Sequence, residues 1–103
     1  MASVFIGQYE QGSREILDYS INWATAMTAE SDSVSTSAWY AEAGNPTIGD
    51  GTNGAASPSI STSTTTAWIV NGTVGEIYHL TNVITTTAGR KLEASIKITI
   101  TDK

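Results

Sequence analysis

The fold is decided by the stretch from residue 92 to residue 100, Leu92-Glu93-Ala94-Ser95-Ile96-Lys97-Ile98-Thr99-Ile100. Every even position in this stretch is apolar, and every odd position is polar or charged. Successive side chains of a β-strand point to opposite faces of its sheet, so this period of two predicts a strand with one buried and one solvated face. The preceding Thr87-Ala88-Gly89-Arg90 is typical of a turn, because its glycine is able to adopt a positive φ.

We expect the partner of this strand in residues 76–86, which would make a long hairpin. Tyr78, Leu80 and Ile84 share one face of that segment, although Asn82 interrupts it. A tyrosine near the start of the penultimate strand suggests a tyrosine corner, with the Tyr78 hydroxyl bonded to the preceding loop.

Further strands are expected upstream. Residues 17–23 alternate cleanly, with an inward face of Leu17, Tyr19, Ile21 and Trp23. Residues 34–40 are predicted to form a strand that carries Trp39, and either Trp23 or Trp39 would supply the indole buried between the sheets. Residues 65–70 also form a predicted strand, but its facing has two alternatives: Ala67 and Ile69 point inward, or Trp68 and Val70 do.

The segments between these strands are less regular. Residues 24–30 suit one helical turn or a loop, because they are too few for a helix that is stable alone. Residues 44–63 are rich in Gly, Asn, Pro, Ser and Thr, which predicts a long connection with one short strand near residues 58–61.

Composition supports an all-β protein. Serine and threonine make up 28 of the 103 residues, and Thr, Ile and Val together number 32, against 3 leucines. Residues with stiff, branched side chains favour strands over helices. With turns about every ten residues, the strands predict an immunoglobulin-like antiparallel β-sandwich of six to seven strands rather than a barrel.

The length of 103 residues suits a single core. We assign residues 14–103 to the immunoglobulin-like sandwich domain. Residues 1–13 have two alternative interpretations: an extra edge strand of the same domain, or an N-terminal arm that docks elsewhere. Their apolar residues Phe5, Ile6 and Tyr9 form the candidate docking interface.

Charge and cysteine content exclude several function classes. Ten acidic and five basic residues give a net charge of −5, which disfavours nucleic acid and anionic membranes as partners. The first residues lack the pattern of a signal peptide, and no apolar run is long enough to span a bilayer. The chain has no cysteine, so we expect no disulfide, no thiolate metal site and no cysteine nucleophile.

Several short motifs match binding or catalytic patterns in their letters, but the sequence around them does not fit the structure that each motif needs. Residues 49–54 match the letters of a phosphate-binding glycine loop, but no strand-loop-helix unit surrounds them. As a calcium loop, the same stretch would have Ser61 where a bidentate carboxylate is needed. His79 is the sole histidine, and the acidic residues Asp18, Glu30, Asp32 and Asp50 show no shared spacing. Asn71-Gly72-Thr73 matches a glycosylation sequon but reads more simply as a turn. We expect no enzyme, no metal and no cofactor.

Several segments taken together resemble a known family. They are Glu15-Ile16-Leu17-Asp18-Tyr19-Ser20-Ile21-Asn22-Trp23, Asp32-Ser33-Val34-Ser35-Thr36-Ser37-Ala38-Trp39, Trp68-Ile69-Val70-Asn71-Gly72-Thr73-Val74-Gly75, and Tyr78-His79-Leu80-Thr81-Asn82-Val83-Ile84-Thr85-Thr86, followed by Gly89-Arg90. In order and spacing they resemble the fiber–tail adaptor proteins of tailed bacteriophages, which are small immunoglobulin-like virion domains. The first block departs from the family pattern, with Asn22-Trp23 in place of Asp-Trp, and the 44–63 connection is longer than usual.

The resemblance implies a non-enzymatic tail or neck adaptor that connects fibers to the tail. Its partners would be other virion proteins of the tail, neck or fibre, with repeated copies around a symmetry axis. It would be made in the host bacterial cytoplasm and reside in the virion. Two alternatives remain: a capsid decoration or head-fibre module, and a carbohydrate-binding module on a fibre. The last requires an exposed aromatic platform, for which Trp39, Tyr40 and Trp68 are the candidates.

Overall fold

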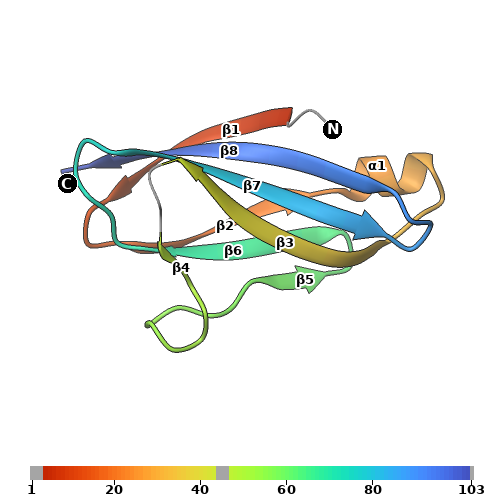
Figure 1. Ribbon diagram of the computed structural model, residues 1–103, viewed down its shortest axis with the longest axis horizontal. Helices are drawn as coiled ribbons and strands as arrows, with labels where there is room; N and C mark the ends of the chain where they lie inside the picture. Colours follow the sequence, from red (N-terminus) through yellow and green to blue (C-terminus); the bar gives the residue numbers. More distant parts are fainter. Residues whose placement is uncertain (1–3, 44–46, 103) are drawn as a thin grey trace.

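The computed structural model describes residues 4–43 and 47–102, with side chains described from 7 to 41 and from 47 to 102. These residues form eight strands and one short helix (Figure 1). The elements are β1 (Val4–Gly12), β2 (Ile16–Asn22), α1 (Ala24–Ala29), β3 (Val34–Ala43), β4 (Thr47–Ile48), β5 (Ser59–Ser61), β6 (Thr64–Val70), β7 (Ile77–Thr86) and β8 (Lys91–Thr101). No helix in the described part of the chain has the length and apolar character needed to cross a membrane.

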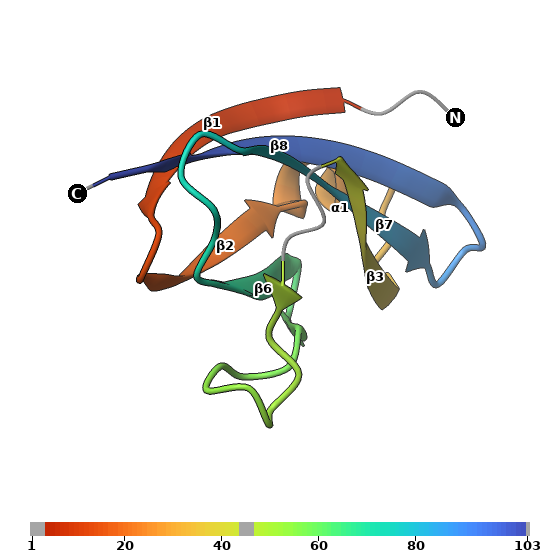
Figure 2. The ribbon, with the colours of Figure 1, turned by 60° about the vertical axis from the view of Figure 1, so that its left-hand side comes forward.

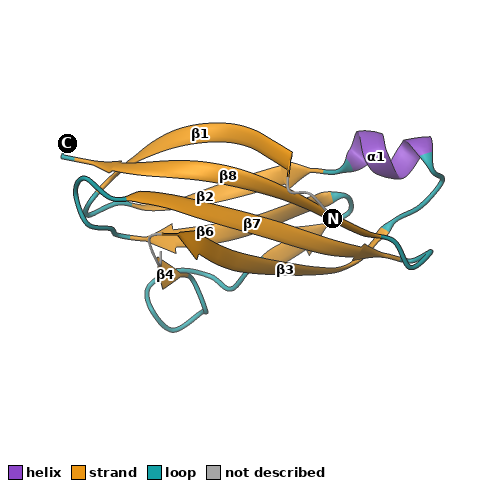
Figure 3. Ribbon diagram, turned by 45° about the horizontal axis from the view of Figure 1, so that its top comes forward, coloured by secondary structure: helices purple, strands orange, loops and turns teal. Residues whose placement is uncertain are grey.

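The strands form two sheets that pack face to face. One sheet has the order β1-β8-β7-β3, and the other has the order β2-β6-β4 with β5 also paired to β6. Figure 2 shows the two layers, and Figure 3 shows how strands cover most of the molecule's length. The predicted β-sandwich is therefore confirmed. All six strands predicted from residue 14 onward are present, and the two-residue β4 is an addition that the sequence did not reveal.

The predicted hairpin of β7 and β8 is present, and it supplies seven of the fifteen buried apolar residues among those that the structure describes. Its antiparallel register places Leu80 opposite Ile96 and Ile84 opposite Leu92. Five of its apolar residues are at most 1% exposed: Leu80, Ile84, Ile96, Ile98 and Ile100. The turn uses Gly89 at a φ of +94°, a conformation that side chains disfavour.

The structure also decides the facing of β6. Thr65, Ala67 and Ile69 are fully buried, so the alternative with Ala67 and Ile69 pointing inward is correct. Trp68 therefore lies on the outer face of its sheet, where the connection between β4 and β5 approaches it. A Cβ on Gly49, in that connection, would clash with the Ala56 carbonyl oxygen and would lie 2.8 Å from the Ala55 Cβ and 3.1 Å from the Trp68 Cβ, so a glycine is needed for this close approach.

A buried amide lies at the centre of the sandwich. Asn82 is 0% exposed, and its Oδ1 accepts hydrogen bonds from Trp23 Nε1 (3.1 Å) and Thr65 Oγ1 (2.6 Å). Its Nδ2 donates to Ser37 Oγ (2.8 Å) and to the Ala38 carbonyl (3.0 Å). Asn82 thus interrupts the apolar face of β7 because it joins that strand to β3 and, across the core, to β6 and Trp23.

The hydrogen bonds of Asn82 also decide which tryptophan, Trp23 or Trp39, is the indole buried between the sheets. Trp23 is 9% exposed and its indole N–H bonds to residues of both sheets, so it is the buried indole. The short helix α1 follows it directly and buries Met27 beside it. Trp39 is partly buried against the core, and its Nε1 has no hydrogen-bond partner among the described residues.

We expect Asn82→Ala to lower the free energy of unfolding by about 2–4 kcal/mol, because it leaves a cavity and orphans buried donors and acceptors. Chemical denaturation followed by tryptophan fluorescence measures this loss. Ser20→Ala serves as the control, since the Ser20–Thr66 hydroxyl pair lies on the exposed face of β2 and β6. The control should change stability by less than about 0.5 kcal/mol. Equal effects of the two variants would contradict a central role for the amide.

Candidate docking site

The segment that holds the predicted docking residues is an edge strand. β1 pairs in parallel with β8, from Val4 opposite Ala94 to Gly12 opposite Thr101. No other described strand pairs with β1, which therefore leaves one edge of the sheet open (Figure 1). The backbone of Phe5 and Ile6 belongs to this strand, and their side chains lie outside the described residues.

The end of β1 is anchored across the sandwich by Gln11. This side chain is fully buried, and its Oε1 accepts a hydrogen bond from the Tyr19 hydroxyl at 2.8 Å. Its Nε2 donates to the carbonyls of Glu15 (2.7 Å) and Ile69 (3.1 Å), which belong to the turn before β2 and to β6. Gln11, in the segment that the sequence analysis left as an arm or an edge strand, is thus one of the most buried of the described residues.

Tyr9 lies next to this anchor and reaches the surface. Its ring centroid is 5.1 Å from that of Tyr19, with the rings tilted by 57°, yet its side chain is 42% exposed. A Cβ on Gly7 would lie 3.0 Å from the Tyr9 hydroxyl, so the glycine leaves room for the ring. Gln8, Tyr9, Glu10 and Thr99 line a shallow hollow beside the strand. Of the three predicted docking residues, Tyr9 is the one whose exposed side chain the structure describes.

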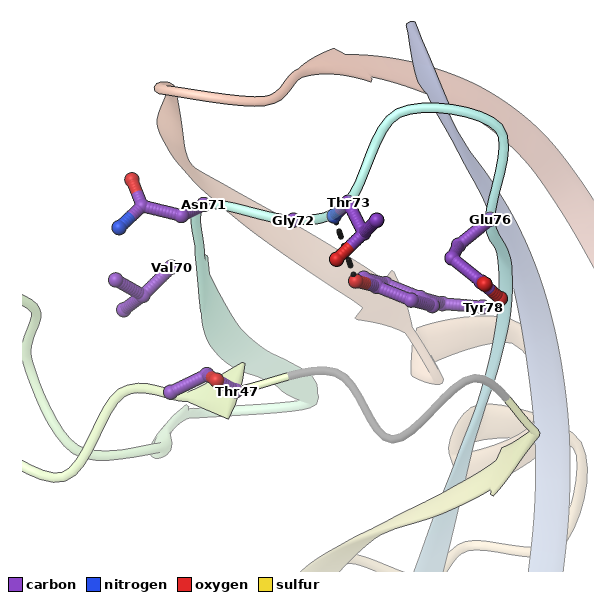
Figure 4. Close-up of a pocket in the computed structure, with 7 residues that line it drawn as sticks. All are labelled: Thr47, Val70, Asn71, Gly72, Thr73, Glu76 and Tyr78. Carbon is purple, nitrogen blue, oxygen red and sulfur yellow. Dashed lines mark hydrogen bonds between the residues drawn. The ribbon is translucent and has the colours of Figure 1, made fainter.

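A second hollow lies at one end of the sandwich, between β4 and the loop from β6 to β7 (Figure 4). Tyr78 forms one wall, and its hydroxyl accepts a hydrogen bond from the Thr73 backbone N–H at 3.1 Å. This bond back to the preceding loop is the one predicted for a tyrosine corner. Asn71 adopts a φ of +55° in that loop, which fits the turn reading of the Asn-Gly pair.

The predicted acidic candidates are not brought together in one site. Glu30 and Asp32 both approach Arg90, at 3.5 Å and 2.8 Å, while Asp18 belongs to β2 and Asp50 to the loop after β4. The Arg90 contact ties the start of β3 to the hairpin turn, which is a structural use of the carboxylates.

Hydrogen bonds explain the acidity of these carboxyl groups. Bonding from the Thr86 side chain, followed by backbone N–H groups and Arg90, lowers the pKa of Asp32 to about 2, although desolvation opposes it. The Thr52 hydroxyl and backbone N–H likewise lower the pKa of Asp50, which caps its own turn. Hydrogen bonds to the ionised form favour that form, so both carboxyl groups stay ionised at neutral pH.

The remaining candidates are dispersed. His79 is exposed on β7 opposite Lys97, and residues 49–54 form a loop with no helix after it. Among the described residues, no three His, Cys, Asp or Glu side chains are grouped so that they would hold a metal ion. Of the three aromatic residues considered for a sugar platform, Tyr40 is 54% exposed, whereas Trp39 and Trp68 are partly buried.

Burial raises the pKa of the Tyr19 hydroxyl from 10.0 to about 12, assisted by the charges of Glu15 and other neighbours. In the unfolded chain this phenol ionises near pH 10, so its contribution to stability is complete below that pH. We therefore expect the free energy of unfolding to fall as the pH rises from 10 to 12. Denaturation midpoints at a series of alkaline pH values measure the slope. Tyr19→Phe should flatten it, and the exposed-residue control Tyr40→Phe should not; the reverse pattern would show that Tyr19 is not responsible.

The comparison with solved structures shows a shared fold. The chain is similar to the 2,6-sialyltransferase of Photobacterium sp. JT-ISH-224, crystallised with CMP and lactose, at 11% identity and a TM-score of 0.63. The similarity covers 98% of this chain but 18% of that one, so this chain spans less than a fifth of the sialyltransferase. At this identity the likeness concerns the fold alone. No curated protein matches the chain.

The comparison with protein families is more informative. The model described as podophage GP4 fiber-tail adaptor protein gp77 matches residues 11–99. The matched region begins at the anchor residue Gln11 and includes both sheets from β2 to β8. Because this match covers well over half of its length, the chain belongs to the podophage fiber-tail adaptor family gp77.

Proposed function

We propose that this protein is a non-enzymatic structural component of a tailed-phage virion, an adaptor that connects fibers to the tail. The observation that carries the proposal is the family match over residues 11–99. The described residues support it, because their polar side chains stabilise turns and join strands. Gln11 and Asn82, the two largest buried polar side chains, are each held by hydrogen bonds within the domain.

We infer that docking involves the start of the chain, through Phe5, Ile6 and Tyr9. The open edge of β1 and the 42% exposure of Tyr9 support this inference. The anchor at Gln11 supports the assignment of β1 to the domain, and the open edge of β1 supports its use by a partner. In this proposal the edge strand and the docking segment, which were alternatives in the sequence analysis, are the same element.

Repetition in the virion would strengthen such a contact. Copies arranged around a symmetry axis engage a multivalent partner together, so each single contact is allowed to be weak. The protein would be made in the host cytoplasm, where the absence of cysteine is suitable because folding needs no oxidation. The rigid sandwich would then transmit force between fibre and tail without a conformational step.

A complementation experiment tests the proposal. Virions assembled without this protein are supplied with the wild type, with Tyr9→Ser, or with the control Tyr40→Ser, which removes another exposed tyrosine. We expect electron cryomicroscopy to place the wild type and the control between tail and fibre, and Tyr9→Ser to lower occupancy severalfold. Thermal unfolding of each purified variant separates weak docking from poor folding.

The adaptor role and the docking role of Tyr9 are contradicted by different outcomes. Density on the capsid rather than at the tail would exclude the adaptor role. Full occupancy by Tyr9→Ser would leave the adaptor role in place and remove Tyr9 from the docking interface.

A further inference from the structure

β1 has an unusually accessible edge. From Gly7 to Gly12 it pairs with β8 in unbroken register, after one irregularity between Phe5 and Gly7. Its sequence contains no proline and no lysine, which are the residues that commonly protect an edge from pairing with another chain. The regular part of this edge, from Gly7 to Gly12, exposes backbone N–H and C=O groups that are able to pair with an added strand.

The opposite edge of the same sheet is different. β3 has register irregularities near both of its ends, between Val34 and Thr36 and between Ala41 and Ala43. The β5 region also approaches it, since Ser37 lines a hollow together with Pro58 and Ile60. An added strand would therefore meet a bent and partly covered edge at β3, and a regular one at β1.

The side chains beside the β1 edge indicate which side chains an added strand would need in order to fit there. Neighbouring residues of a strand point to opposite faces, so Tyr9 and Glu10 present an aromatic ring and a carboxylate on the two sides of the edge. Tyr9 packs on Tyr19 toward the second sheet. Glu10 is the sole ionisable carboxylate in β1, and the ion pairs found among the described residues all belong to Arg90.

Charge distinguishes between the possible occupants. A second copy of this chain carries a net charge of −5 and brings no lysine or arginine on its own β1. A segment with a basic residue would pair with Glu10 and be attracted by the whole acidic domain. Electrostatics therefore favours a basic strand from another protein over self-pairing.

We propose that the edge of β1 between Gly7 and Gly12 binds an extended, lysine- or arginine-bearing segment of a neighbouring virion protein by strand addition. This inference rests on the adaptor function proposed above and supplies its mode of attachment. Backbone hydrogen bonds give the affinity, an apolar residue packs against Tyr9, and a basic residue on the other face pairs with Glu10.

The test uses the full-length protein and two synthetic octapeptides, one alternating valine and lysine and the other alternating valine and glutamate. Binding is followed by amide chemical shifts and by hydrogen exchange. We expect the valine–lysine peptide to bind more tightly and to protect amides in residues 7–12 from exchange. Glu10→Gln should reduce its preference over the valine–glutamate peptide by about two- to fivefold, the range expected for an exposed ion pair. Glu93→Gln, on the neighbouring strand β8, is the matched control and should leave the preference unchanged.

Strand addition at the β1 edge is contradicted by any of the following results. Absence of protection in β1, protection centred on β2 or β3, or equal binding of the two peptides would exclude it. A dimer seen by light scattering without peptide, with the β1 amides already protected, would identify a second copy as the occupant. Imaging keeps the two proposals separate: peptide binding at β1 by a protein absent from the tail–fibre joint would refute the adaptor role alone.

Discussion

Asn82 lies in the middle of the core strand β7, and its buried amide needs hydrogen-bond partners there because an unpaired buried polar group is costly. The Asn82 amide forms hydrogen bonds with four groups: Trp23, Thr65, Ser37 and the Ala38 backbone carbonyl. These partners lie in both sheets, so the network sets the depth of Trp23 and the register of β3 on β7. The apolar contacts of β8 supply stabilisation in bulk, while this network selects one arrangement of the two sheets.

Gln11, at the edge of the sandwich, is a second buried amide that needs hydrogen-bond partners. Its amide bonds to Tyr19 and to the carbonyl of Ile69, which belong to the sheet opposite its own strand. The strand is thereby anchored at one end, while no other described strand pairs with its outer edge. The residue that holds β1, Gln11, and the exposed residue of β1, Tyr9, are different ones. In the function that we propose, this separation lets the strand present a surface to a neighbour without unfolding.

Part of the candidate docking site could be predicted from the sequence. The apolar character of Phe5, Ile6 and Tyr9 drew attention to the start of the chain, and Tyr9 is exposed in the structure. Glu10 and Gln11 carried no such signal, because polar residues in a predicted arm suggest solvent exposure. Only the alternation of Tyr9 and Gln11 with Gln8 and Glu10 hinted that two faces of this segment differ. The burial of Trp68 depended on the β4–β5 connection, whose path is not encoded in any local repeat.

The sequence by itself determined where six of the eight described strands lie and which face of β2, β7 and β8 is buried, because a period of two is a local property of the backbone. It also determined the turn at Gly89, since positive φ favours glycine. The tertiary structure decided the facing of β6, the partners of Asn82 and Gln11, and the pairing of β1 with β8. These features join residues as far apart in the sequence as Val4 and Ala94, so they depend on which strands become neighbours when the domain folds.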